Sequence, residues 1–168
     1  MGYYVNIVES TFTIPQANLA EAYERLCALN DRDDLKRGRS HPGEELTDEA
    51  RKALGYHPSK WFSWLDPNYP ASCPDVEAIL KALGFEVSVD GGGDLCIDAY
   101  NDKTGQEEVF LAAVSDLATG SIKWQGEHGE RWLEVYGGEA VMVSEAVEAW
   151  GEPTPRKLDD LDPFYGYR

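Results

Sequence analysis

Residues 85–99 read FEVSVDGGGDLCIDA, and this stretch decides the class of fold. Apolar residues alternate with polar ones over 85–89 and again over 95–99, on either side of the turn-forming residues 90–94. Alternation with a period of two is typical of strands that bury one face. The stretch therefore predicts an antiparallel β-hairpin.

Similar patterns extend outward in both directions. Further strands are predicted at 3–8, 121–125, 131–136 and 140–143. Apolar residues at helical spacing predict helices at 16–30, at 47–54, from Pro74 to a stop at Gly84, and at 106–118. Residues 31–46 and 102–105 are expected to form a loop and a turn.

This order of elements contains runs of consecutive strands, and it lacks the strict alternation of a parallel α/β fold. It predicts an α+β protein, with a mostly antiparallel sheet and about four helices packed on one face. We expect a single domain over residues 1–150 and an irregular tail, rich in proline and aspartate, over 151–168.

Charge is the most unusual feature of the composition. The chain of 168 residues has a formal net charge of -16, from 31 acidic and 15 basic side chains. Residues 74–151 hold 16 acids and 4 bases, so most of the excess lies there. Such a field repels nucleic acid and attracts basic partners, although it also serves solubility. We expect a basic protein as partner and no direct binding of nucleic acid.

Aromatic side chains gather in the segment 61–69. Trp61, Trp64 and Tyr69 lie close together in the sequence, and Asp66 lies between them. Trp and Tyr are enriched at binding hot spots, so these four residues are candidates for an interface. The alternative is that the rings anchor the segment to the core. Trp124 and Trp132 flank a predicted hairpin turn and are expected to form a cross-strand pair.

Acidic residues around the hairpin of residues 85–99 are candidates for steering a basic partner. Asp90 and Asp94 flank Gly91-Gly92-Gly93, and Asp98 lies on the second strand. The three glycines precede a strand and not a helix, so they do not predict a phosphate site. The spacing of the aspartates does not match a calcium loop.

Other residue types point to no chemistry. His41, His57 and His128 are scattered, and the cysteines Cys27, Cys73 and Cys96 form no CxxC pair. Free thiols are expected, and Cys96 fits a small core residue. We predict no catalytic residue, no metal site and no cofactor from these patterns.

Several short stretches resemble small acidic proteins of unknown function from actinobacteria and their bacteriophages. They are Phe12–Pro15, Leu26-Cys27 to Asp34–Lys36, Trp61–Trp64, Leu83–Phe85, Lys103–Glu107 and Trp124–Glu127. The resemblance implies a phage or prophage accessory protein in the cytoplasm of a bacterial host, of a class that includes inhibitors of host defence. The absence of a signal-peptide pattern and of a run of ~20 apolar residues agrees with this location and predicts no membrane partner.

Three hypotheses for function follow. The first is a non-enzymatic acidic binding module, a phage-encoded modulator or inhibitor of a host defence protein. The second is an immunity or antitoxin protein that neutralises a basic toxin. The third is a hydrolase whose site is assembled from distant carboxylates or a cysteine, and its signature would be a cleft with a strongly perturbed titratable group. The sequence favours a protein that is not an enzyme.

Overall fold

The structure is a computed structural model that describes residues 3–38, 47, 49–50, 59–61, 64–146 and 153–157. Its strands are β1 (Tyr4–Ser10), β2 (Thr13–Ile14), β3 (Glu86–Val89), β4 (Leu95–Ala99), β5 (Asn101–Lys103), β6 (Gly120–Gly126), β7 (Arg131–Tyr136), β8 (Val141–Glu145) and β9 (Thr154–Arg156). Its α-helices are α1 (Leu19–Ala28), α3 (Tyr69–Ser72), α4 (Val76–Ala82) and α5 (Glu107–Ala113). Short 3-10 helices occupy Gln16–Asn18, Leu29–Asp31 and Asp33–Leu35.

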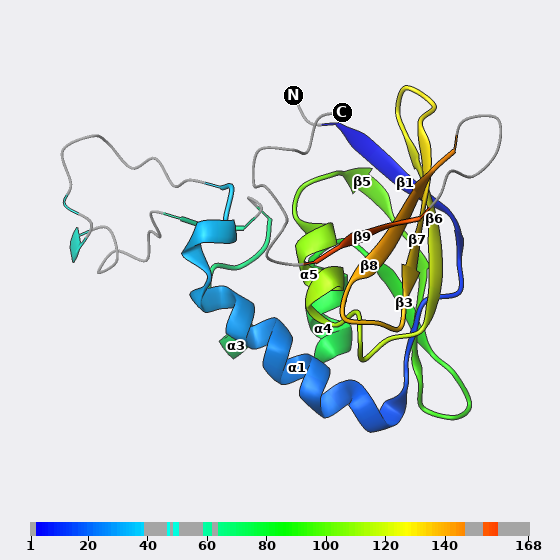
Figure 1. Ribbon diagram of the computed structural model, residues 1–168. Coiled ribbons are helices and arrows are strands. Elements are labelled where there is room, and N and C mark those ends of the chain that lie inside the picture. Colours follow the sequence, from blue (N-terminus) through cyan, green and yellow to red (C-terminus); the bar gives the residue numbers. More distant parts are fainter. Residues whose placement is uncertain are drawn as a thin grey trace.

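The strands form two sheets (Figure 1). The larger sheet has six strands in the order β5-β1-β6-β7-β8-β9, and the smaller has three in the order β2-β4-β3. All pairings between named strands in the described residues are antiparallel. The predicted α+β class with a mostly antiparallel sheet is therefore confirmed, whereas the packing of every helix on one face stays a prediction.

The predicted hairpin over 85–99 is present as β3 and β4, which pair from Glu86↔Ala99 to Val89↔Leu95. The Asp90 carboxylate closes its turn by accepting hydrogen bonds from the backbone N–H groups of Gly92 and Asp94, at 2.8 and 3.0 Å. Gly93 has φ 89°, a conformation that side-chain-bearing residues rarely adopt. Local turn chemistry thus sets the register of this hairpin.

Helix α4 ends where the sequence predicts and begins at Val76, two residues after the predicted start at Pro74. Asp75 is its N-cap and accepts a hydrogen bond from the N–H of Ala78 at 2.8 Å. Gly84, with φ 100°, follows its last turn. Ile79, Leu80 and Leu83 are fully buried, so the apolar stripe of this helix faces the core.

The aromatic segment before α4 is joined to α5 through the core. The ring of Phe110 on α5 meets the ring of Trp61 edge-on at 4.9 Å between centroids, and that of Tyr69 at 5.7 Å. All three side chains are buried. The hydroxyl of Tyr69 donates to the carbonyl of Leu26 on α1, so one aromatic cluster fixes three helices to each other.

Two predictions of irregular structure need correction. Residues 102–105 were expected to form a turn, but Asn101–Lys103 pair with β1 as strand β5. Residues 151–168 were expected to be irregular, but Thr154–Arg156 pair with β8 as strand β9. Strands of three residues are too short for an alternating pattern, and their pairing depends on a neighbouring strand.

Some predictions fall on other parts of the chain. The helix expected at 47–54 lies largely outside the described residues. His41 and His57 lie wholly outside them. No helix in the described part of the chain is long and apolar enough to cross a membrane.

The two tryptophans of the aromatic segment are expected to differ in their effect on stability. Trp61 is 1% exposed and Trp64 is 43% exposed. Replacing Trp61 by alanine should lower the free energy of unfolding by about 3–5 kcal/mol, because it leaves a cavity beside Phe110. The same change at Trp64 should cost less, about 1 kcal/mol, because much of this ring is already in contact with water. Urea denaturation of both variants measures the difference, and equal losses would contradict the burial of Trp61.

Candidate functional site: an acidic pocket on the larger sheet

The site is built on the inner face of the β6–β7 hairpin. Because side chains alternate between the two faces of a strand, Trp132, Glu134 and Tyr136 all point to the same side of β7. Trp124 on β6 lies opposite Trp132, and their rings stack at 6.0 Å with an interplanar angle of 14°. The predicted cross-strand pair is therefore present, and a buried glutamate lies next to it.

Glu134 is 2% exposed, and its carboxylate is held by several donors. Its Oε2 accepts hydrogen bonds from the indole N–H of Trp124 at 3.0 Å and from the hydroxyl of Tyr136 at 2.6 Å. Its Oε1 is paired with the guanidinium of Arg156 on β9. A buried carboxylate is tolerated only when it is paired and hydrogen-bonded, and this one meets both conditions.

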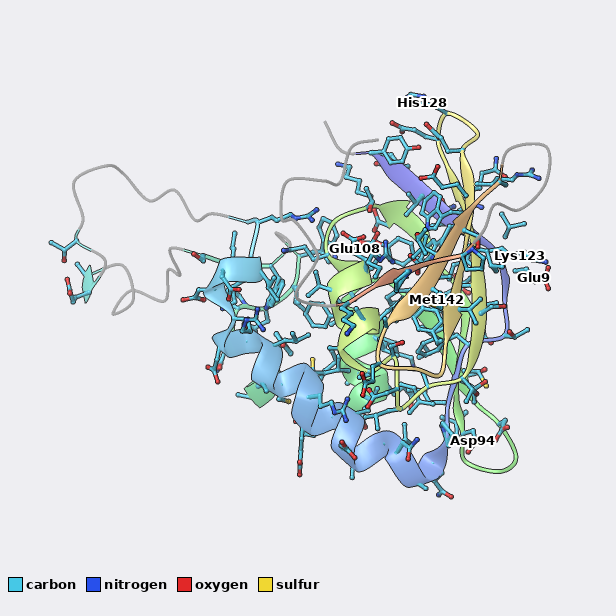
Figure 2. All side chains as sticks on the ribbon, viewed as in Figure 1. Glu9, Asp94, Glu108, Lys123, His128 and Met142 are labelled. Atoms are coloured by element: carbon cyan, nitrogen blue, oxygen red, sulfur yellow. The ribbon has the colours of Figure 1, made fainter. Side chains whose placement is uncertain are left out.

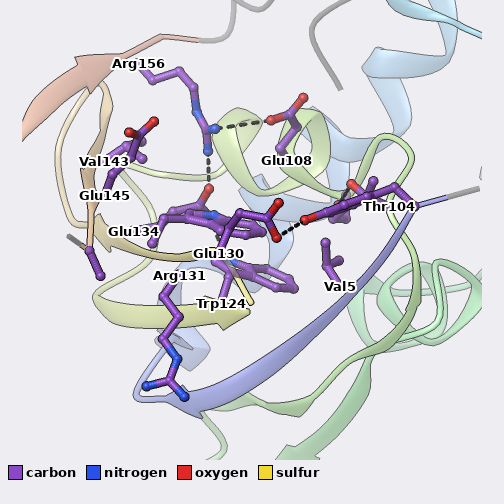
Figure 3. Close-up of a pocket in the computed structure, with 14 residues that line it drawn as sticks. Val5, Thr104, Glu108, Trp124, Glu130, Arg131, Glu134, Val143, Glu145 and Arg156 are labelled. Atoms are coloured by element: carbon purple, nitrogen blue, oxygen red, sulfur yellow. Dashed lines mark hydrogen bonds and ion pairs between the residues drawn. The ribbon is translucent and has the colours of Figure 1, made fainter. Parts of the chain in front are cut away.

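Arg156 also reaches across to α5 (Figure 3). Its Nη1 lies 3.1 Å from Oε2 of Glu108, and the other oxygen of Glu108 lies 3.5 Å from Nη2 of Arg37. One guanidinium therefore joins carboxylates from a helix and a strand. Arg37 comes from the segment 31–46, which was predicted to be a loop, and it pairs inside the molecule with this network.

Burial sets the protonation behaviour of this network. Burial raises the pKa of Glu108, although Arg156 and Arg37 oppose the shift. Burial also raises the pKa of Tyr136 well above its ordinary value, and the neighbouring Glu134 carboxylate adds to this effect. Burial disfavours the charged form of Arg156, yet Glu134 and Glu108 together raise its pKa above the ordinary value. Arg156 is therefore fully charged at every physiological pH.

Glu107, the neighbour of Glu108, has a different environment. Its carboxylate accepts hydrogen bonds from the hydroxyl of Thr104 at 2.5 Å and from the N–H of Gly105 at 2.7 Å. No lysine or arginine side chain is paired with it among the described residues. Burial raises its pKa from 4.5 to about 7, and the two hydrogen bonds only partly oppose the shift. Glu107 therefore changes its charge near neutral pH.

Glu107, Glu108, Glu134 and Arg156 line a pocket of about 460 Å³. The stacked tryptophans and Val143 form an apolar wall of the pocket. Tyr3 also lines the pocket, and its hydroxyl donates a hydrogen bond to the carboxylate of Glu130. The carboxylates outnumber the guanidiniums, because the lining contains five glutamates (Glu107, Glu108, Glu130, Glu134 and Glu145) and two arginines (Arg131 and Arg156). The pocket thus combines negative charge with aromatic surface.

The candidate residues of the aromatic segment are not part of this pocket. Trp61 and Tyr69 are buried in the core, which agrees with the alternative that these rings anchor the segment. Trp64 is exposed, and Asp66 is exposed with Oδ1 accepting from the N–H of Asn68 at 2.8 Å. Only Trp64 and Asp66 are thus open to a surface partner.

The candidate aspartates of the hairpin lie elsewhere again (Figure 2 labels Asp94). Asp90 caps its own turn, and Oδ1 of Asp94 accepts a hydrogen bond from the N–H of Gln16 at 2.8 Å. Asp98 is exposed on β4. Two of the three therefore have structural roles, and the structure does not bring them to the pocket.

Cysteine and histidine chemistry receives no support from the described residues. Burial raises the pKa of Cys73, which keeps it a thiol at neutral pH, and none of the three cysteines lines the pocket. His128 lies at the β6–β7 turn, where its ring meets that of Tyr3 edge-on at 5.5 Å. Within the described residues, no three His, Cys, Asp or Glu side chains are arranged to hold a metal ion.

The residues that build the pocket were missed because they come from distant segments. One signal was available in the sequence, since Glu134 falls between Trp132 and Tyr136 on the inward positions of its strand. An acid at such a position requires a buried donor or a cation. Glu107 and Arg156 carry no comparable signal.

Comparisons with known proteins provide no template for the site. The chain matches no protein-family model, no curated protein and no solved structure. The chemistry of the pocket is therefore inferred from its own geometry.

Replacing Glu107 by glutamine should make the protein more stable at high pH. The unfolded side chain loses its proton near pH 4.5 and the folded one near pH 7, so the native state binds more protons between these values. Stability of the parent protein therefore falls across this window, by about 3 kcal/mol in total. Glutamine has no proton to lose, so the difference between variant and parent in the free energy of unfolding should be small at pH 4.5 and largest above pH 7. Urea denaturation at pH 4.5, 6 and 8 tests this, and a difference independent of pH would contradict the assigned environment.

Proposed function

We propose that this chain is an acidic binding protein whose pocket receives a cationic group from a basic partner protein. The observation that carries the proposal is Glu107, a buried carboxyl on the pocket wall with no cation paired to it among the described residues. A positive group entering the pocket would stabilise the ionised form of Glu107. The pocket therefore gains a counter-charge when it is filled.

Charge on the whole molecule supports the same proposal. The formal net charge of -16 attracts a basic protein over long distances and raises the rate of association. The five glutamates of the pocket would then act at short range. Long-range attraction and local recognition thus favour the same kind of partner.

The aromatic wall suits a cationic side chain. The faces of Trp rings attract cations, and the hydrocarbon part of a lysine or arginine side chain packs well against them. Trp124 is buried and stacks on Trp132, which is partly exposed, and both line the pocket. The ring of Trp132 therefore offers contact to both parts of such a side chain.

The resemblance to proteins of actinobacteria and their bacteriophages guides the choice of partner. In this proposal the partner is a basic host protein, and the chain acts as a phage-encoded modulator or inhibitor. An immunity protein that fills the basic active site of a toxin would use the same charge. Binding to the product of an adjacent toxin gene, and to no host protein, would support that alternative.

A second function is favoured by one observation. Glu107 has a pKa of about 7 inside a pocket of about 460 Å³, which is the environment expected for a general acid. A hydrolase would use it to protonate a leaving group. Turnover in a substrate screen, lost in the Glu107→Gln variant, would establish this function in place of binding alone.

Binding of a basic peptide is expected to strengthen as the pH rises through 7. With the pKa of Glu107 at about 7, roughly 9% of it is ionised at pH 6 and roughly 91% at pH 8, so affinity should rise about 10-fold between these values. The probe is a short Gly-Ser peptide with a central Arg-Lys-Arg, whose charge is constant over this range. Isothermal titration calorimetry at both pH values measures the change.

Two variants control this experiment. Glu107→Gln should bind more weakly at pH 8 and lose the dependence on pH. Glu86→Gln removes an exposed acid on β3, outside the pocket, and should retain it. Equal behaviour of the two variants, or no effect of pH on the parent protein, would refute the role of the pocket.

A further inference from the structure

The pocket already contains a bound arginine, contributed by the chain itself. The guanidinium of Arg156 lies between the carboxylates of Glu134 and Glu108, which belong to a strand and to a helix (Figure 3). Two carboxylates on different sides of one cation suit the planar fork of a guanidinium better than the point charge of an ammonium. These two acids therefore form a seat for an arginine side chain.

The seat is built independently of the strand that fills it. Trp124 and Tyr136 on β6 and β7 hold Oε2 of Glu134, and Arg37 contacts Glu108 from the other side. None of these residues belongs to β9. The carboxylates are therefore held in place by residues that remain if Arg156 leaves, and their charge then requires another cation.

The backbone of strand β9 makes few contacts. It has three residues and pairs with β8 alone among the described strands. The Nε–H of Arg156 is buried without a hydrogen-bond partner among the described residues. A buried donor without a partner is unfavourable, so Arg156 does not satisfy its environment completely.

We propose that Arg156 occupies a guanidinium site that an arginine of the partner protein takes over on binding. The partner's guanidinium would bridge Glu108 and Glu134 in place of Arg156, and β9 would leave the edge of β8. This inference rests on the proposed function, since it requires a basic partner to enter the pocket. It adds that arginine, and not lysine, is the recognised group, and that the chain's own strand competes with it.

The test compares two peptides on three proteins. The peptides are Gly-Ser sequences of equal length with either three central arginines or three central lysines. The proteins are the full-length parent chain, Arg156→Ala and Arg156→Lys, with thermal unfolding used to confirm that each is folded. Calorimetry at pH 8 and low salt gives the affinities.

If Arg156 fills the seat more than about nine-tenths of the time, its removal should raise the affinity for the arginine peptide about 10-fold or more. The affinity for the lysine peptide should change far less. Arg156→Lys retains a positive charge but cannot bridge both carboxylates as a fork, so it should show a smaller gain for the arginine peptide. This second variant keeps the test decisive if Arg156→Ala does not fold.

The outcomes separate this inference from the proposed function. Peptides that bind the parent chain, with no gain for arginine in either variant or an equal gain for lysine, would overturn the guanidinium site and leave the acidic binding pocket standing. No binding of either peptide to any of the three proteins would overturn both. Hydrogen exchange adds an independent check, because amides of β8 that pair with β9 should exchange faster in the parent chain when the arginine peptide is bound.

Discussion

The buried carboxylate of Glu134 is the constraint on which the larger sheet and its pocket depend. A charge removed from water needs donors on all sides, and here they come from β6, β7 and β9. Each donor fixes the position of its own strand on the inner face. The pairing of Glu134 with Arg156, and of Arg156 with Glu108, then ties the edge of the sheet to the start of α5. A single buried charge therefore links elements that are far apart in the sequence.

The first turn of α5 shows how strongly environment separates two identical side chains. Glu107 and Glu108 are adjacent and both line the pocket. Glu108 has cationic partners, whereas Glu107 has a hydroxyl and a backbone N–H. The hydrogen bonds from the hydroxyl and the N–H lower the pKa of Glu107 less than burial raises it, so this pKa reaches about 7. One helix turn thus presents an ion-paired glutamate next to a group that titrates at neutral pH.

Local patterns in the sequence predicted the parts of the fold that local interactions determine. The β3–β4 hairpin follows from alternation, the end of α4 from Gly84, and the Trp124–Trp132 pair from the turn between two predicted strands. Strands β2, β5 and β9 were missed, because two or three residues show no period and pair only when a neighbour is present. Apart from the signal at Glu134, the pocket could not be predicted either, because its residues come from distant segments. A cluster of aromatic residues such as 61–69 also looks alike whether it is buried or exposed, and here Trp61 and Tyr69 are buried while Trp64 is exposed.

Pro155 on strand β9 has a further consequence for the behaviour of the protein at high concentration. The outermost strand of a sheet is a template on which another chain can add, and a proline interrupts the row of N–H groups that such addition needs. While β9 is in place, this edge of the sheet is therefore a poor template for another chain. Strand β8 has no such protection, since Val141, Met142 and Val143 form an apolar run with complete backbone donors. Strand β9 thus covers the edge of β8. Any condition that detaches β9 when no partner is bound exposes β8 as an edge strand to which another chain can add.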